Sequence, residues 1–113
     1  MMYTLFFKIK IHPVTELFPT MPDKELRKLA DDIKTYGLQH PIIMQGDTLL
    51  DGRNRLAACK LAGVVPTFRE YEGKNPVQFI LSANIHRKYL TESQRVMVAA
   101  KLANIKKTSP ANW

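Results

Sequence analysis

The chain has 113 residues, of which 45% are hydrophobic and 24% charged, which is typical of one globular domain with a single core. Lysine and arginine total 17 against 10 acidic residues, so the formal charge of +7 favours anionic partners such as nucleotides or nucleic acid. The single cysteine excludes an internal disulfide and is typical of a reducing compartment. No apolar run approaches the roughly 20 residues of a membrane span, and the apolar start of the chain lacks the basic leader and cleavage site of a signal peptide. We therefore expect a cytoplasmic protein that does not enter a membrane.

Hydrophobic periodicity and helix-capping residues predict the elements in chain order. They are a strand over 7–11, a connection over 14–20, a helix over 22–37, strands over 41–45 and 48–50, a helix over 52–63, a strand over 66–71, and helices that start at 75 and 91. Gly37 and Gly63 are the predicted helix ends. Asn75 is a predicted N-cap, and Thr91 with Gln94 has the spacing of a capping box.

This order predicts a small α+β domain, with a mixed sheet packed against helices and a helical C-terminal part. We expect the domain to cover residues 1–106. Residues 106–110 are polar and basic, and the chain ends on a tryptophan. We therefore expect residues 107–113 to be a basic tail or linker that leads to a DNA-binding region beyond this chain.

The segment Leu49–Gly63 combines a strand end, a glycine and a helix rich in small residues. It places Arg53 and Arg55 in the first helical turn, beside N–H groups that have no acceptor inside the helix. Cations are unfavourable there because a helix N-terminus carries partial positive charge, and they become favourable when an anion is bound. The sequence therefore predicts a phosphate site that contains Gly52, Arg53, Asn54 and Arg55. The alternative is that both arginines are solvated and paired with nearby acids.

A second polar cluster lies at residues 82–88, where another predicted helix ends. Asn84 and Arg87 fall on or near one face of that helix. The Asn84 amide oxygen suits a hard cation, and the Arg87 guanidinium suits a phosphate. Together with the Gly52 segment, they are expected to hold a polyphosphate from both sides, with Mg²⁺ between the phosphates and Asn84. The alternative is a polar helix end that its own basic residues cap.

Other chemistries find little support in the sequence. His12, His40 and His86 are far apart, and no Cys/His cluster has the spacing of a zinc site. Cys59 lies in the middle of a predicted helix and is interpreted as a packed, unreactive thiol. The sequence has no glycine–serine–glycine elbow and no evident Ser/His/Asp arrangement.

Four stretches, in order, resemble the N-terminal domain of ParB-type chromosome and plasmid partition proteins, which has the ParB/sulfiredoxin fold. They are Leu29–Ile43 with its GLxxPI segment, Leu50–Ala58 against the family's GERRxRA box, Ala83–Arg87 against its ENxxR box, and Leu90–Gln94 at the start of the following helices. The resemblance extends from about Ile11 to Leu102 and depends on the order and spacing of these boxes.

This resemblance implies a nucleotide-binding module. In such partition proteins the first box binds the triphosphate of CTP, the second helps to hold phosphate and Mg²⁺, and the nucleotide controls clamp closure on DNA. Gly52 and Arg55 match the first box, and Asn84 and Arg87 match the second. The resemblance thus implies CTP with Mg²⁺ as the cofactor, a homodimer, and DNA as a partner, bound mainly through a helix-turn-helix region beyond this chain. Plasmid partition, or regulation in a plasmid or phage, is the process it implies.

The match departs from the family boxes at several positions. Arg53, Asn54 and Ala57 replace a glutamate and two arginines of the first box, and Ala83 replaces the glutamate of the second. Loss of that carboxylate near the Mg²⁺ argues against hydrolysis more than against binding.

An enzyme on the same scaffold is the alternative function: a nuclease, an NTPase, or a phosphotransferase similar to the free-serine kinases of this fold. Such a kinase needs a carboxylate base near the phosphate. Glu16, Asp47 and Asp51 are the candidates, and Asp51 is the nearest in sequence to the predicted phosphate site. Sulfiredoxin chemistry is not expected, because arginines and an asparagine occupy the positions that match the cysteine, histidine and arginine of its box.

Overall fold

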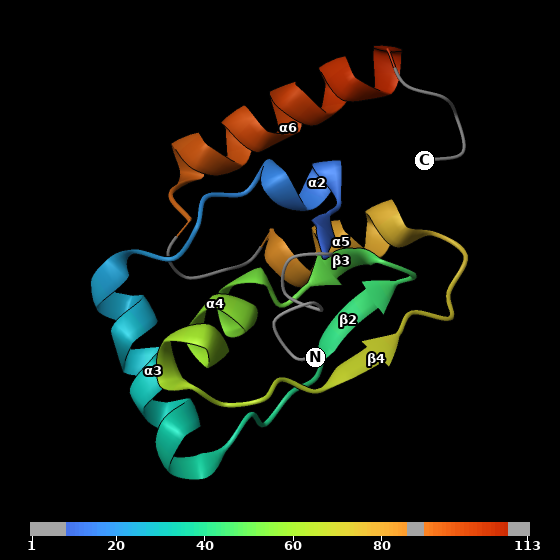
Figure 1. The fold of residues 1–113 in the computed structure, drawn as a ribbon. Helices are drawn as coiled ribbons and strands as arrows, with labels where there is room; N and C mark the ends of the chain where they lie inside the picture. Colours follow the sequence, from blue (N-terminus) through green and yellow to red (C-terminus); the bar gives the residue numbers. More distant parts are fainter. Residues whose placement is uncertain (1–8, 86–89, 109–113) are drawn as a thin grey trace.

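A four-stranded mixed sheet with helices on both faces forms the described part of the chain (Figure 1). The structure, a computed structural model, describes residues 9–85 and 90–108, and side chains as far as Ile105. The elements are β1 (Lys10–Ile11), α2 (Pro13–Glu16), α3 (Asp23–Tyr36), β2 (Ile42–Gln45), β3 (Thr48–Asp51), α4 (Arg53–Ala62), β4 (Phe68–Glu70), α5 (Pro76–Asn84) and α6 (Glu92–Thr108). The predicted α+β class, with a mixed sheet and a helical C-terminal part, is confirmed.

The strands lie in the order β1-β3-β2-β4. The predicted pair β2 and β3 is antiparallel and joined by the tight turn at Gly46–Asp47, whereas β1 pairs with β3 and β4 pairs with β2 in parallel. The Glu70 carboxylate of β4 accepts hydrogen bonds from the Gly46 N–H at 3.0 and 3.2 Å, which ties the edge strand to that turn.

Side chains of β3 alternate between two cores, because successive residues of a strand point to opposite faces. Leu49 packs with Ile42 of β2 and Leu56 of α4 on one face. Leu50 packs on the other face with Val14 of α2 and Ile80 of α5. Both leucines are fully buried, so each face of the sheet depends on the strand that leads directly into α4.

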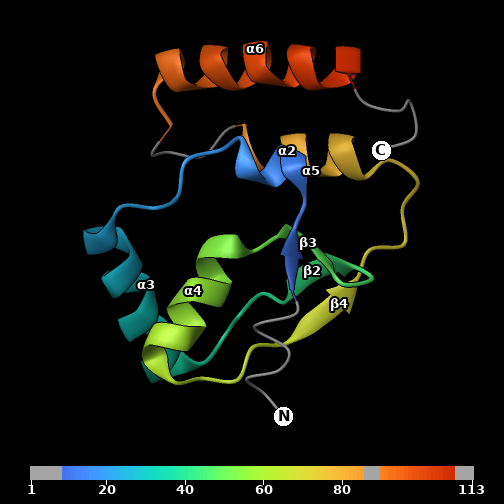
Figure 2. The same cartoon turned by 45° about the horizontal axis from the view of Figure 1, so that its top comes forward.

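The helices form two groups on the two faces (Figures 1 and 2). α3 packs against α4 through Ala30 and Ile33, which contact the fully buried Ala58 and Cys59. α6 lies beyond α2 and α5 on the other side, where Val98 joins the core and the Arg95 Nε–H donates to the Ile85 carbonyl at 2.7 Å. None of the helices in the described ranges is long and apolar enough to span a membrane.

Most predicted helix ends are confirmed. Gly37 and Gly63 follow the last residues of α3 and α4, and both have positive φ. The capping box forms at the start of α6, where the Gln94 N–H donates to Thr91 Oγ1 at 3.1 Å and the Thr91 N–H donates to Gln94 Oε1 at 2.9 Å. Asn75 accepts from the Gln78 N–H and caps α5 as predicted. These ends form as expected because each depends on residues within one helical turn.

The segment 14–20 was predicted to be a connection, and this is wrong for its first residues. α2 begins at Pro13, where the fixed φ of proline suits the first helical position, and His12 Nδ1 accepts from the Val14 N–H at 3.1 Å. Histidine is a rare N-cap, so the local pattern did not indicate a helix start.

Two further boundaries differ in extent. β1 covers only Lys10–Ile11 of the predicted 7–11: Ile9 is not part of the strand, and residues 7 and 8 lie outside the described part. β4 is also shorter than the predicted 66–71. α6 continues to Thr108, two residues past the predicted domain end at 106. The assignment of 107–113 as a linker stays a prediction, and its first two residues are helical.

Protonation of His12 is expected to destabilise the fold in mild acid. His12 is buried, and burial lowers its pKa from the ordinary value of 6.5. Its Nδ1 must also remain unprotonated to accept from Val14. The unfolded chain therefore binds the proton more readily, so the stabilisation is complete above pH 6.5 and falls as the pH drops below it.

Urea unfolding at pH 7.5 and pH 5.5 measures this effect. His12→Ala is expected to cost about 1 kcal/mol at pH 7.5, the usual value of an N-cap, and less at pH 5.5. His12→Asn keeps an N-cap acceptor that does not titrate, so it should show a weaker pH dependence than the wild type. An identical pH dependence in His12→Asn would assign the titration to another group.

Candidate nucleotide site

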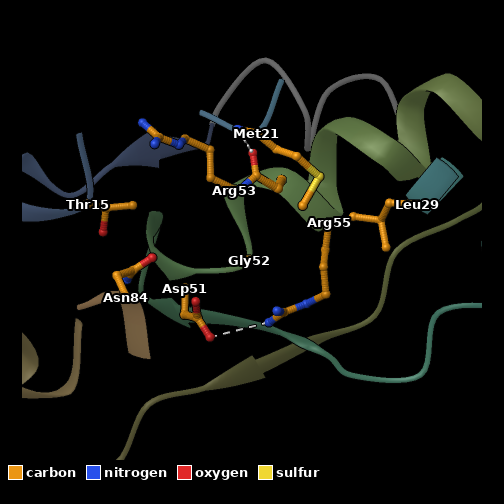
Figure 3. Close-up of a pocket in the computed structure, with 9 residues that line it drawn as sticks. Thr15, Met21, Leu29, Asp51, Gly52, Arg53, Arg55 and Asn84 are labelled. Atoms are coloured by element: carbon orange, nitrogen blue, oxygen red, sulfur yellow. Dashed lines mark hydrogen bonds and ion pairs between the residues drawn. The ribbon is translucent and has the colours of Figure 1, made fainter. Parts of the chain in front are cut away.

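A cavity of about 230 Å³ lies where β3 ends and α4 begins (Figure 3). It is lined by Thr15, Met21, Leu29, Asp51, Gly52, Arg53, Asn54, Arg55 and Asn84. The structure thus brings together every described residue that the sequence placed in the phosphate and metal sites. Arg87, the remaining predicted phosphate ligand, lies outside the described residues.

Gly52 forms the corner of the cavity and is the N-cap of α4. Its φ of 107° and ψ of 19° lie in a region that L-residues with a Cβ rarely adopt. A Cβ at this position would lie 3.1 Å from Ile42 Cγ1, 3.3 Å from Ile42 Cα and 3.1 Å from Arg55 Nη2. Glycine therefore allows α4 to start close against β2.

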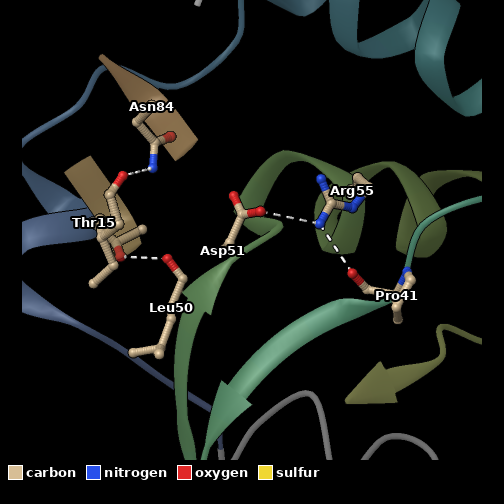
Figure 4. Close-up of polar contacts among 7 residues, drawn as sticks. Thr15, Pro41, Leu50, Asp51, Arg55 and Asn84 are labelled. Atoms are coloured by element: carbon tan, nitrogen blue, oxygen red, sulfur yellow. Dashed lines mark hydrogen bonds and ion pairs between the residues drawn. The ribbon is translucent and has the colours of Figure 1, made fainter. Parts of the chain in front are cut away.

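Arg55 occupies one side of the cavity and is held from two directions (Figure 4). Its Nη2 donates to the Pro41 carbonyl at 3.0 Å and lies 3.4 Å from Asp51 Oδ2. The two charged side chains are only 18% and 15% exposed. The buried Arg55 Nε has no hydrogen-bond partner among the described residues. The alternative that the arginine pairs with a nearby acid is thus correct for Arg55, but this pair lies inside the cavity wall and is not solvated.

Arg53 and Asn54 extend to another rim of the cavity. Arg53 Nη2 donates to the Phe18 carbonyl at 2.6 Å, and Asn54 Oδ1 accepts from the Met21 N–H at 3.1 Å. Figure 3 shows the Arg53 and Arg55 side chains leaving α4 in different directions. The sequence predicted that the two arginines bind one anion together. In the structure they line the same cavity but do not converge on one point.

Asn84 lies across the cavity from α4, at the C-terminal end of α5. It is buried, and its Nδ2 donates to the Ile80 carbonyl at 2.8 Å. Its amide oxygen has no hydrogen bond to a described residue. Asp51 lies on the same side of the cavity as Asn84 (Figures 3 and 4). The site therefore contains a carboxylate and an amide oxygen, which are the ligands that Mg²⁺ prefers.

Only one of the three candidate carboxylates lines this cavity. Asp51 does so, while Asp47 lies in the β2–β3 turn and pairs with Lys10 at 3.3 Å, and Glu16 is exposed on α2. The Thr48 hydroxyl and Lys10 lower the pKa of Asp47, so Asp47 is a poor base as well as a distant one.

Cys59, His12 and His40 do not line the cavity, and His86 lies outside the described residues. The Cys59 thiol is fully buried against α3, and burial raises its pKa, as expected of a packed and unreactive thiol. Within residues 9–85 and 90–108, no group of three His, Cys, Asp or Glu side chains could hold a metal ion.

Thr15, Met21 and Leu29 are lining residues that the sequence did not indicate. Thr15 Oγ1 donates to the Leu50 carbonyl at 2.8 Å and so attaches α2 beside the end of β3. Met21, which precedes α3, and Leu29, within α3, supply apolar surface. No local pattern marks these residues, because they reach the cavity from parts of the chain more than twenty residues before α4.

Comparisons with known proteins support the fold. No protein-family model matches the sequence, and no curated protein sequence matches it. Among solved structures, the chain is similar to the C-terminally truncated chromosome-partitioning protein ParB from Caulobacter crescentus, complexed with CTP-gamma-S. The TM-score is 0.55 at 19% sequence identity. The match covers 90% of this chain but only 59% of the ParB chain. The chain therefore has a ParB-like α+β fold.

Proposed function

We propose that this chain is a ParB-like nucleotide-binding module that holds the triphosphate of a nucleoside triphosphate at the N-terminus of α4. The observation that carries this proposal is the cavity at Gly52, which is lined by a helix start, two arginine side chains and an asparagine amide. The likeness to a ParB solved with a CTP analogue makes CTP the first nucleotide to test.

The residues present fit an anion. Helix N-terminal amides and guanidinium groups are the usual phosphate ligands of proteins. The buried Arg55 Nε, which has no described acceptor, is a donor that a bound phosphate oxygen would satisfy. Arg53 and Arg55 also lie at the positive end of the α4 dipole, which is unfavourable for cations. A bound anion would therefore accept hydrogen bonds and would also offset this positive potential.

The residues also fit a magnesium ion that accompanies the triphosphate. Asn84 would hold it through its amide oxygen, with Asp51 on the same side of the cavity and phosphate oxygens as the remaining ligands. The ion would neutralise part of the phosphate charge. Asp51 would then substitute for the carboxylate that is missing at Ala83.

The biological setting follows from charge and from the ParB-like fold. A formal charge of +7 favours nucleic acid as a partner, and we propose that the module belongs to a DNA-associated partition or plasmid or phage regulatory protein that dimerises. DNA is expected to bind mainly through regions beyond this chain. The proposed nucleotide site comprises Gly52, Arg53, Asn54, Arg55 and Asn84, together with Arg87, which lies outside the described residues.

Titration of the protein with ATP, GTP, CTP and UTP, each with Mg²⁺, tests the function. Isothermal calorimetry should show 1:1 binding of one nucleotide above the level seen with inorganic triphosphate, and assays should detect no release of phosphate. Equal and weak binding of all four and of inorganic triphosphate would overturn the proposal of a nucleotide site.

A phosphotransferase or NTPase is the second candidate, because Asp51 places a carboxylate in the cavity. Asp51→Asn distinguishes the two functions. In a binding module this change removes a negative charge that competes for Arg55, so affinity for the triphosphate measured without Mg²⁺ should rise about fivefold, or ~1 kcal/mol. Asp47→Asn removes an equal charge outside the cavity and serves as the control. Phosphate release by the wild type that Asp51→Asn abolishes would instead favour the enzyme.

A further inference from the structure

The connection between α2 and α3, residues 17–22, passes along the rim of the cavity without forming a helix or strand. We call it the strap. Two side chains from the first turn of α4 hold it: Arg53 donates to the Phe18 carbonyl at 2.6 Å, and Asn54 accepts from the Met21 N–H at 3.1 Å. The position of the strap thus depends on residues that also line the cavity.

Arg53 has a stronger potential partner than the Phe18 carbonyl. A guanidinium bound to a phosphate makes a hydrogen bond between two charged groups, which is roughly twice as strong as one to a neutral acceptor. The positive end of α4 also disfavours Arg53 until an anion is bound. A triphosphate at the start of α4 therefore competes with the strap for this side chain.

Phe18 also connects the cavity to the core beneath α6. Phe18 is 3% exposed and packs in one cluster with Leu50 of β3, with Leu90, which precedes α6, and with Val98 of α6. The same residue thus presents its carbonyl to Arg53 and its ring to the packing of the C-terminal helix. Figures 1 and 2 show the chain passing from α2, beside α6, to α3, beside α4.

We propose that Arg53 exchanges partners, donating to the strap at Phe18 when no anion is bound and to a phosphate when the triphosphate is bound. The strap is then a ligand-sensitive segment that loosens on binding and relays occupancy of the cavity toward α6. By linkage, anything that loosens the strap also strengthens binding of the triphosphate. This inference rests on the proposed function and adds a means of regulation to the same site.

Hydrogen exchange at the Met21 amide tests whether Arg53 changes partners. The Met21 N–H is protected by its hydrogen bond to Asn54, and it should exchange faster with solvent when the strap loosens. In the wild type, saturation with CTP and Mg²⁺ should speed exchange at Met21 roughly tenfold, the effect expected from loss of one charge-assisted hydrogen bond. Arg53→Gln should show fast exchange without nucleotide and little further change with it. Arg69→Gln makes the same charge change on exposed β4, away from this cavity, and should match the wild type.

Calorimetry on the same samples separates the possible failures. Binding of CTP with unchanged or slower Met21 exchange would overturn the strap mechanism and leave the proposed function standing. Unchanged exchange in ligand-free Arg53→Gln would also overturn it, because Arg53 would then not hold the strap. Absence of binding to any nucleotide would overturn both.

Discussion

Arg55→Ala is expected to weaken triphosphate binding about 10- to 150-fold, which corresponds to ~1.5–3 kcal/mol for a hydrogen bond between charged groups. Arg55 lies against Asp51 and the Pro41 carbonyl at the corner that Gly52 opens, and its buried Nε has no described acceptor. A bound phosphate would take up this unused donor capacity. Calorimetry with CTP and Mg²⁺ measures the loss.

Two variants make the Arg55 measurement specific. Arg55→Lys keeps the charge but lacks the planar fork of donors, so its affinity should fall between those of wild type and Arg55→Ala. Arg69→Ala removes an exposed arginine from β4 and should leave binding unchanged. Because loss of Arg55 removes a charged partner of Asp51 from the cavity wall, urea unfolding should accompany the titration. A folded Arg55→Ala with wild-type affinity would remove Arg55 from the site.

Gly52→Ala is expected to destabilise the fold by ~2–4 kcal/mol and to abolish triphosphate binding. The φ of 107° strains any residue with a Cβ, and the added carbon would press on the backbone and side chain of Ile42. Ile42 is fully buried and cannot move without disturbing the core shared with Leu56. Relief of the strain therefore requires a shift of the α4 N-terminus, which carries the predicted phosphate ligands.

Gly63→Ala is the matched control for this variant. Gly63 also has a positive φ, of 72°, but a Cβ there would meet nothing within 4 Å, and it ends the same helix away from the cavity. It should cost ~1–2 kcal/mol and leave triphosphate affinity unchanged. Equal losses of stability in the two variants would show that the close contact with Ile42 adds nothing to the destabilisation of Gly52→Ala.

Much of the fold could be predicted because its signals are local. Gly37 caps the end of α3, Gly52 and Gly63 cap the two ends of α4, and α6 starts at a capping box, as predicted. Each of these features depends on backbone groups within about four residues, so the nearby sequence carries the necessary information. α2 was missed because its cap, His12, is not a residue that usually caps a helix.

The sequence by itself determined that a glycine, two arginines and an asparagine stand at one helix start and that a second asparagine ends another helix. Only the tertiary structure decided where those side chains point. Asn84 and Asp51 meet in one cavity because α5 packs on the face of β3 opposite α4. Arg53 and Asn54 bond to the strap, more than thirty residues earlier in the chain, because that segment passes the start of α4. The physical reason is that helix starts and ends depend on neighbouring backbone groups, whereas the partner of a long polar side chain depends on which distant segment packs beside it.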